Sequence, residues 1–438
     1  MHIKNFDPFD FKKKEINGVP VYYKNIPWAP CIHVRVVFNS GAFSDPVKKE
    51  GVAHFLEHTI CQGPERFGGK KGLKEWSLKN VLNSFNAMTN FYTTHYEFKC
   101  LPTKFEKVIS DLKDIIFNSS FKEDAFELEK KVIIQEAWRR YENEKLKKFL
   151  KESVHNLGHG TIKERFYTAL GWPETIEKIT MEDLKNFYKE NYVKENMFII
   201  LAGNIESKNF QTLKKFLHKI PENKKFISNK NKLEKSFNLS KVVKPLQNKV
   251  IKNSEELGLV REQAEYEISL ATNKIKLEKN WGTSKVFAKF LQNLLMDKYR
   301  YDNGLCYNIN TSSYFSKYDY NIGFNLKLDE KNISIVENEL ENTFKEILSD
   351  KYLKRFEDIK QALIDQIESD EDNSYIVVSS VLNQLRAFDK IFTVSQTLQA
   401  VKKVTYSDIK IFLKTLLKDR EYIYTEIILP SKKENEKK

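Results

Sequence analysis

The sequence predicts an α+β protein built from two homologous domains, each a mostly antiparallel β-sheet packed with α-helices. Three observations support this fold class. The 438 residues are typical of two or three domains. Two segments repeat the same pattern at an offset of 225 residues, about half the chain. Each half also combines strands of period two with long helical stretches, which favours sheets covered by helices.

The repeat marks the start of a helix near the end of each half. Its two copies, IEKITMEDLKNFYK and VKKVTYSDIKIFLK, occupy residues 176–189 and 401–414. Each copy contains a threonine followed three residues later by an aspartate, at Thr180/Asp183 and Thr405/Asp408. At this spacing the threonine oxygen accepts a free amide, and the aspartate lies where the helix dipole favours negative charge. An apolar β-rich run follows each copy.

The other elements come in the same order in both halves. An early strand is expected at residues 32–38 and again at 266–270. A second strand of period two is predicted by Tyr92, Thr94, Tyr96 and Phe98, and its counterpart by Tyr318, Tyr320, Ile322, Phe324 and Leu326. Helical stretches are expected at about 104–150 and 334–368.

These patterns set the expected domain boundaries. Residues 1–225 are predicted to form the first domain and residues 251–430 the second. Residues 226–250, rich in Lys, Asn and Ser without clear periodicity, are expected to be the linker, and residues 431–438 a disordered tail.

Composition narrows the function classes. Apolar residues make up 41% of the chain, enough for a hydrophobic core. The net charge of +13 comes from scattered lysines and no recognised nucleic-acid module accompanies it, so we expect no nucleic-acid partner. The four cysteines are far apart without C-x-x-C spacing. Without a signal core or an apolar run of membrane-spanning length, the sequence predicts a soluble cytoplasmic protein that does not bind membranes.

The residues His54-Phe55-Leu56-Glu57-His58 form an H-x-x-E-H motif. On a helix, His54 and His58 lie one turn apart on one face and can reach the same metal ion. Glu57 lies on the same side and can act on a water molecule as a base. The alternative interpretation of the motif alone is two surface histidines on an amphipathic helix.

A catalytic zinc site needs a third protein ligand. The predicted helix 121–141 offers Glu129 and Glu136, seven residues apart on one face. With these residues the chain resembles the inverzincin family of pitrilysin, insulin-degrading enzyme and mitochondrial processing peptidase, as a short two-domain bacterial-type member. The resemblance implies that Glu136 is the third ligand of one Zn²⁺ per chain. It also implies that Glu129 supports the site as a nearby carboxylate and is a candidate to substitute in catalysis.

Two further features of the family can be placed in this sequence. Its substrate-binding edge strand corresponds to Asn86, Ala87, Met88 and Thr89. An edge strand has unpaired backbone groups to which an extended peptide can add as a further strand. The family's R-x-x-x-G-L-x-Y pattern corresponds to residues 300–307, which makes Arg300 and Tyr307 candidates to hold a substrate carbonyl and stabilise an oxyanion. Without the resemblance, residues 86–89 would be interpreted as an ordinary hairpin strand. Arg300 and Tyr307 would be interpreted as a loop arginine and a strand tyrosine.

The repeat offset makes Lys279-Asn280-Trp281-Gly282-Thr283 the counterpart of residues 54–58, so the second domain is expected to carry no metal motif. The resemblance therefore implies a zinc metalloendopeptidase with Glu57 as general base. Longer relatives have four such domains around a chamber, so two chains are expected to face each other as a clamshell. Arg300 and Tyr307 would then complete the site of the opposite chain.

A homodimer acting on peptide substrates is the simplest assembly. Two alternatives stay open. The chain could be the catalytic half of a heterodimer that processes a dedicated precursor peptide. It could also be a non-catalytic peptide-binding or scaffold homologue.

Overall fold

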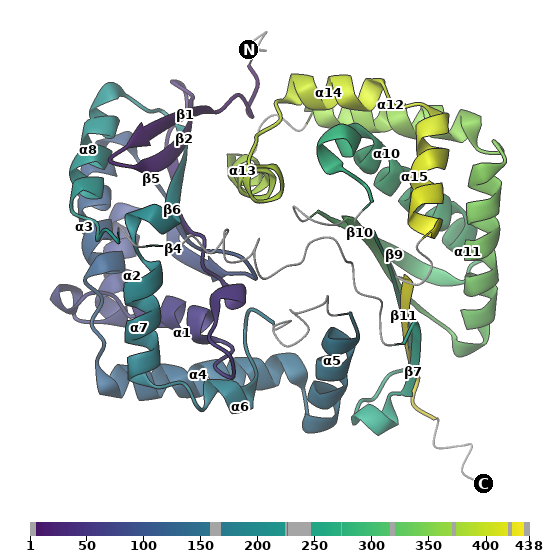
Figure 1. Ribbon diagram of the computed structural model, residues 1–438, viewed down its shortest axis with the longest axis horizontal. Coiled ribbons are helices and arrows are strands. Elements are labelled where there is room, and N and C mark those ends of the chain that lie inside the picture. The colour runs from purple at the N-terminus through teal and green to yellow at the C-terminus, as the bar shows by residue number, and fades with distance from the viewer. Residues whose placement is uncertain are drawn as a thin grey trace.

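The structure is a computed structural model, and it describes residues 6–157, 168–223, 226, 247–272, 274–315, 320–369, 374–418 and 423–432. Two sheets lie in separate halves of the molecule, with helices packed around them (Figure 1). The α+β class and the two homologous domains that the sequence predicts are confirmed.

Within the described residues, the first sheet has six strands in the order β1-β2-β6-β3-β5-β4. Neighbouring strands are antiparallel except β2 and β6, which are parallel. The strands are β1 (Lys12–Ile16), β2 (Val19–Asn25), β3 (Ile32–Phe38), β4 (Leu82–Thr89), β5 (Thr94–Cys100) and β6 (Met197–Gly203). The helices of this half are α1 (Val52–Ile60), α2 (Lys70–Asn80), α3 (Phe105–Phe117), α4 (Glu123–Tyr141), α5 (Glu144–Leu157), α6 (Pro173–Ile176), α7 (Met181–Asn191) and α8 (Ser207–His218).

In the part of the chain that the structure describes, the second sheet repeats this plan in five strands, in the order β7-β11-β8-β10-β9. Its parallel pair, β7 and β11, occupies the place of β2 and β6. The strands are β7 (Lys249–Asn253), β8 (Ala264–Thr272), β9 (Cys306–Phe315), β10 (Tyr320–Leu328) and β11 (Ile423–Leu429). The helices are α10 (Leu277–Leu295), the π-helical segment η7 (Met296–Asp302), α11 (Ile333–Leu348), α12 (Leu353–Ser369), α13 (Ser374–Phe388), α14 (Val394–Lys402) and α15 (Tyr406–Lys418).

The two predicted helix starts have the expected caps. The Thr180 hydroxyl accepts the Asp183 amide at the start of α7, while the Asp183 carboxylate accepts the Thr180 amide. Thr405 and Asp408 make the same pair of hydrogen bonds before α15. These reciprocal bonds satisfy amides that have no partner inside the helix.

One element is shorter than the pattern predicts. Tyr92 is not part of β5, which begins at Thr94. The Asn90 side-chain oxygen accepts the amides of Tyr92 and Thr93, at 3.0 and 2.9 Å, and this local turn interrupts the strand. Tyr318, expected in the corresponding strand of the second half, lies outside the described residues.

One helix of each half packs against the other half. Helix α13, from the second half, packs its valines and leucines against β3 and β6 of the first sheet. In return, α5 of the first half packs Leu146 and Phe149 against Leu257, Leu259 and Ile428 of the second half. Figure 1 shows α13 beside β6 and α5 near β7 and β11. The exchange joins the halves through two apolar contacts.

The structure adjusts two expected boundaries. Strand β7 begins at Lys249, so the second sheet starts inside the segment 226–250 that was expected to be linker. Most of that segment lies outside the described residues. The expected disordered tail 431–438 begins with an ordered residue, since Ser431 exchanges hydrogen bonds with Arg261 beside the end of β11. Residues 433–438 lie outside the described residues. Among the described helices, none is both long and apolar enough to cross a membrane.

Candidate metal centre

Helix α1 begins at a tight turn that sets the position of the motif. Gly51 precedes it with φ of 104°, a left-handed conformation that favours glycine. The buried Asp45 carboxylate accepts the amides of Gly51 and Ala53 at 2.7 and 2.8 Å. A carboxylate at this end satisfies free amides and complements the helix dipole. The first turn of α1 is therefore fixed just before His54.

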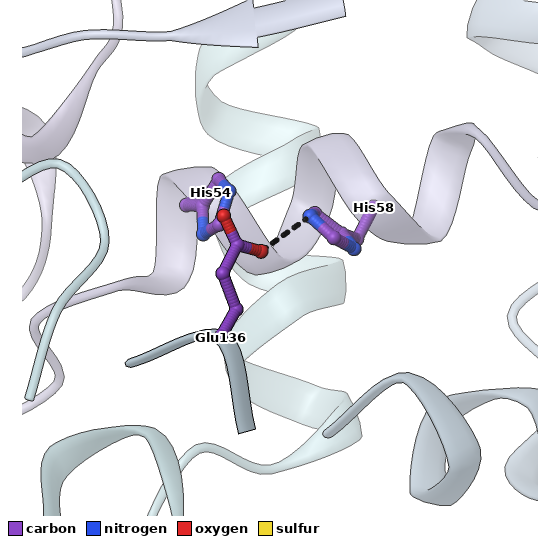
Figure 2. Close-up of side chains that lie close together, drawn as sticks. All are labelled: His54, His58 and Glu136. Carbon is purple, nitrogen blue, oxygen red and sulfur yellow. Dashed lines mark ion pairs between the residues drawn. The ribbon is translucent and has the colours of Figure 1, made fainter. Parts of the chain in front are cut away.

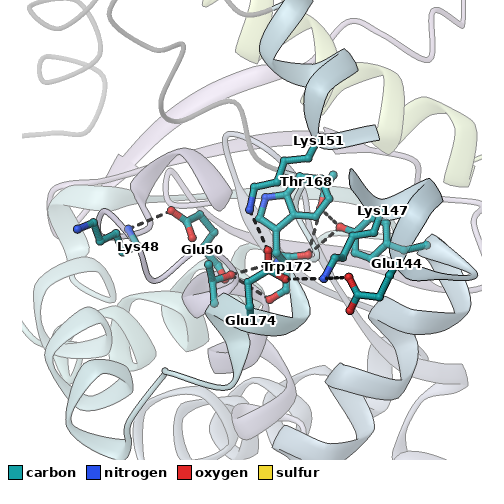
Figure 3. Close-up of polar contacts among 11 residues, drawn as sticks. Lys48, Glu50, Glu144, Lys147, Lys151, Thr168, Trp172 and Glu174 are labelled. Atoms are coloured by element: carbon teal, nitrogen blue, oxygen red, sulfur yellow. Dashed lines mark hydrogen bonds and ion pairs between the residues drawn. The ribbon is translucent and has the colours of Figure 1, made fainter. Parts of the chain in front are cut away.

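A polar network holds the loop before α1 against α5 and α6 (Figure 3). The Thr175 hydroxyl donates to the backbone oxygen of Glu50 at 2.8 Å. Glu174, next to Thr175 on α6, accepts from Lys147 and Lys151 of α5 at 3.1 and 2.9 Å. The start of α1 is thus tied to two helices that follow it by more than ninety residues.

His54 and His58 lie on the face of α1 that does not pack into the core, while Phe55, Leu56 and Ile60 are fully buried. The two imidazole centroids are 4.6 Å apart. Helix α4 packs against α1 through the stacked rings of Phe55 and Phe126, 4.9 Å apart. This contact brings α4 alongside the motif.

Glu136 projects from α4 toward both histidines (Figure 2). One of its carboxylate oxygens, Oε2, lies 3.7 Å from His58 Nε2. His54, His58 and Glu136 each offer one donor atom, and these atoms all lie within 4.8 Å of one another. The structure therefore brings together the three residues that the sequence predicts as metal ligands.

The chemistry of these three groups fits a zinc ion. Two imidazoles and one carboxylate are ligands that zinc accepts, and they leave a fourth position open. Burial, with a smaller effect of His58, lowers the pKa of His54 to about 3, so its imidazole is neutral, the form that binds metals. The buried Nδ1 of His54 has no hydrogen-bond partner among the described residues.

Glu57 is buried beside the two histidines. Its Oε2 accepts the Thr89 hydroxyl at 2.7 Å. Burial raises the pKa of Glu57, and the hydrogen bond from Thr89 opposes part of that rise. A raised pKa suits a carboxylate that takes and returns a proton near neutral pH. The contact with Thr89 links the predicted base to the predicted substrate strand, which the motif spacing did not indicate.

Glu129 is buried behind His58. Its two oxygens have different partners: Oε2 is 3.0 Å from His58 Nδ1, and Oε1 accepts Lys70 Nζ at 2.8 Å. Burial by itself would raise the pKa of Glu129, but the hydrogen bonds from His58 and Lys70 outweigh it and lower the pKa to about 2. Sequence reasoning missed Lys70, because its contact depends on how α2 packs and follows no motif spacing.

The predicted substrate strand lies at the edge of the first sheet. Asn86, Ala87, Met88 and Thr89 belong to β4, which pairs with β5 on one side. The other side of β4 has no partner strand among the described residues. The Asn86 amide is 3.4 Å from Glu97 Oε1, and Glu97 is paired with the buried Arg35. Since Thr89 contacts Glu57, this edge runs directly to the motif.

Arg300 and Tyr307 lie in the other half of the molecule, on η7 and at the start of β9. The Arg300 guanidinium is 4.7 Å from the centre of the Tyr307 ring, and the Tyr307 side chain is 82% exposed. Figure 1 shows β9 across the molecule from α1 and α4. The chain does not bring this pair to its own predicted metal ligands. Tyr307 instead borders a hollow of about 460 Å³ on the second sheet, together with Glu267 and Glu426.

The counterpart of the motif serves packing in the second half. Residues 279–283 form part of the first turns of α10. The Trp281 ring stacks on Phe392 at 5.2 Å and meets Phe388 edge-on. A side chain at Gly282 would collide with the backbone of Ala400, since an added Cβ would lie 2.3 Å from its oxygen. This close approach explains why a small residue stands where Glu57 stands in the first half.

Two family models match the chain. The model described as "Insulinase (Peptidase family M16)" matches residues 21–162, and the one described as "Peptidase M16 inactive domain" matches residues 178–363. Together they account for most of the sequence. The second match covers much of the half in which Trp281 and Gly282 replace the motif.

Curated relatives and a solved structure agree with these matches. The probable mitochondrial-processing peptidase subunit beta of Schizosaccharomyces pombe is 32% identical over 192 residues, 43% of this chain and 40% of that protein. An uncharacterized zinc protease of Rickettsia felis is 26% identical over 43% of this chain and 45% of that protein. The matches span less than half of either relative. A protease from Helicobacter pylori shares the fold, with a TM-score of 0.78 and 16% identity over 96% of this chain and all of that one.

Proposed function

The chain belongs to peptidase family M16, and we propose that it is a zinc-dependent endopeptidase that hydrolyses unfolded peptides or a peptide precursor. The observation that carries the proposal is the convergence of His54, His58 and Glu136 within 4.8 Å, with the carboxylate of Glu57 beside them. Relatives named as a processing peptidase subunit and as a zinc protease support the same chemistry.

His54, His58 and Glu136 would hold the ion, one per chain. When bound there, zinc supplies Lewis acidity toward a peptide carbonyl and toward the attacking water. Glu57 takes a proton from that water and delivers it to the leaving amine. The Thr89 hydroxyl holds one oxygen of Glu57, which leaves the other oxygen to exchange the proton.

Substrate backbone would add to the free edge of β4. Main-chain hydrogen bonds at such an edge accept many sequences, provided that the peptide is extended. The same strand carries Thr89, so a peptide bound along it lies next to Glu57. Asn86, held by Glu97, is positioned to contact the added strand.

Arg300 and Tyr307 would act in the site of a second chain. Within one chain they lie in the other half, and Tyr307 is 82% exposed. A clamshell of two chains would place the second half of each chain over the metal centre of the other. The Tyr307 hydroxyl would then donate to the developing oxyanion, with Arg300 beside it. The closed chamber would admit unfolded peptides and exclude folded proteins.

Replacement of Glu57 by glutamine tests the chemistry. The purified Glu57→Gln chain should keep zinc but cleave a mixed peptide library at least about a hundredfold more slowly, because a general base has been removed. Metal analysis and peptide mass spectrometry give the two readouts. Wild-type cleavage by the variant would refute the role of Glu57. A zinc-loaded wild-type chain that cleaves no peptide would indicate a binding or scaffold protein.

Mixed dimers test whether sites are shared. A Glu57→Gln chain and a Tyr307→Phe chain are each impaired alone. If each site uses both chains, a mixed dimer has one doubly impaired site and one intact site, so mixing should restore activity. No recovery, with mixed dimers shown by mass spectrometry, would argue against sharing.

A heterodimer is the second candidate assembly. It is favoured by the relatives named as the beta subunit of a processing peptidase. The molar mass of the purified chain in solution separates the two candidates. A stable, active dimer of this chain alone favours the homodimer, whereas an inactive monomer favours a missing partner.

A further inference from the structure

A short chain of polar contacts runs from the protein surface to a proposed zinc ligand. Lys70, the first residue of α2, donates from Nζ to Glu129 Oε1 at 2.8 Å. The other oxygen of Glu129 is 3.0 Å from His58 Nδ1. On the far side of the same imidazole, Nε2 faces Glu136 at 3.7 Å. Three elements, α2, α4 and α1, therefore meet at one histidine ring.

Glu129, in the middle of this series of contacts, depends on both of its partners. The Glu129 side chain is only 2% exposed, and a buried carboxylate is costly unless its oxygens are hydrogen-bonded. His58 satisfies one oxygen and Lys70 the other. Without Lys70, Oε1 would lose its charged partner, and the carboxylate would be free to turn away from His58.

We infer that Lys70 is a positioning residue for the proposed zinc ligand His58 and acts through Glu129. The inference rests on the proposed function. When Nδ1–H of His58 is donated to Glu129, the lone pair of Nε2 is left for the ion and the ring is held toward His54 and Glu136. Lys70 locks the carboxylate that enforces this tautomer and orientation.

The alternative is an ion pair that serves folding alone, between the 60% exposed Lys70 side chain and the buried Glu129. Such a pair would stabilise the zinc-free chain and would not alter metal binding. Zinc affinity and the stability of the zinc-free chain must therefore be measured separately.

Three variants of the full-length chain make the first test. Lys70→Met removes the donor, Lys70→Arg keeps a charged donor, and Lys71→Met removes the same charge from the next, exposed residue of α2. We expect Lys70→Met to weaken zinc binding about tenfold, the lower end for partners behind a metal ligand. Lys70→Arg should recover most of that loss, and Lys71→Met should match wild type. Competition with a zinc chelator measures the affinity.

Two further readouts exclude a merely structural effect. The thermal unfolding midpoint of the zinc-free chain should fall in Lys70→Met, because Oε1 of the buried Glu129 loses its partner, and this fall measures the purely structural part of the effect. The visible absorption of the cobalt-substituted chain should shift in Lys70→Met and return in Lys70→Arg, because it reports the geometry around the ion. A fall in zinc-free stability with an unchanged cobalt spectrum would overturn the inference.

A double-mutant cycle tests whether Lys70 acts through Glu129. In a Glu129→Gln background, Lys70→Met should weaken zinc binding no further, since the carboxylate it holds is gone. Additive losses of zinc affinity from the two substitutions would show that Lys70 does not act through Glu129. A wild-type chain that binds no zinc would refute the proposed function, whereas zinc binding that is equal in wild type and Lys70→Met would refute the inference alone.

Discussion

The two halves of the molecule share a strand order, but they bury different side chains. In both sheets a parallel pair of strands occupies the same position in the strand order. Both strand orders also end at an edge strand, β4 in the first sheet and β9 in the second. Among the described residues, buried charged side chains are concentrated in the first half, including Arg35, Glu57, Glu97 and Glu129. The described part of the second half buries mainly uncharged polar side chains.

We interpret this difference as a cost in stability that the first half bears for its proposed site. Buried charges are costly, and they persist where a site needs shifted pKa values or fixed ligands. In the second half, Trp281 and Gly282 fill the place of the motif with close packing between α10 and α14. One architecture thus carries the proposed metal site in one copy and close side-chain packing at the same place in the other.

The largest expected effect comes from removing a proposed ligand, His54, whose counterpart in the second half is a lysine. His54→Ala should lose zinc and lower peptide cleavage roughly a thousandfold or more, because water activation is lost with the ion. The matched control is Lys279→Ala, at the exposed counterpart position in α10. Zinc content and cleavage should match wild type in that control.

Metal removal completes this comparison. A chelator should inactivate the wild-type and Lys279→Ala chains, and added zinc should restore both. If zinc at the same concentration also restored peptide cleavage by His54→Ala, His54 would not be needed to bind the metal, and the expected difference from Lys279→Ala would be refuted.

The second effect tests whether the halves are joined through their exchanged helices. Leu382 of α13 is 3% exposed and packs on the first sheet. Leu382→Ala should lower the free energy of unfolding by about 3 kcal/mol, within the range for a buried leucine. Leu353→Ala, at an exposed position of α12, should change it by less than about 0.5 kcal/mol. Urea titration measures both, and equal effects would contradict the assigned contact.

The smallest expected effect concerns pH. Burial, with smaller effects of Arg35 and Arg386, lowers the pKa of His95 to about 3, and Glu97 opposes part of this change. Nearby His33 also has a lowered pKa, chiefly because of burial. Below an ordinary pKa of about 6.5, the unfolded chain binds a proton at His95 that the folded chain refuses. This contribution to stability is therefore present above that pH and is lost as pH falls toward 3.

A variant without the imidazole should resist acid better. Between pH 7 and pH 5, His95→Asn should lose about 2 kcal/mol less unfolding free energy than wild type. All eight histidines precede residue 219, so this sensitivity belongs to the first half. Urea titrations at both pH values check the difference. An equal loss in the two chains would show that His95 is not held neutral.

Much of the fold could be predicted from local sequence. The Thr-x-x-Asp caps depend on residues three apart, and the strands of period two depend on alternation along one element. The turn at Asn90 was missed because a side chain competed with the strand for backbone amides. The exchange of α5 and α13 was also missed, since an apolar helix face does not specify which sheet will cover it.

The sequence by itself was enough to predict the proposed ligand set. Residues four apart on a helix, such as His54 and His58, share a face. Glu136 was identified through a family resemblance, from its distance along the chain. Only the tertiary structure decided that Lys70 holds Glu129 and that Thr89 holds Glu57. It also decided that Arg300 and Tyr307 lie in the other half from the proposed metal ligands of their own chain (Figure 1). The physical reason is that periodicity fixes the face on which a side chain lies, whereas contacts between elements depend on how the helices and the sheet edge pack.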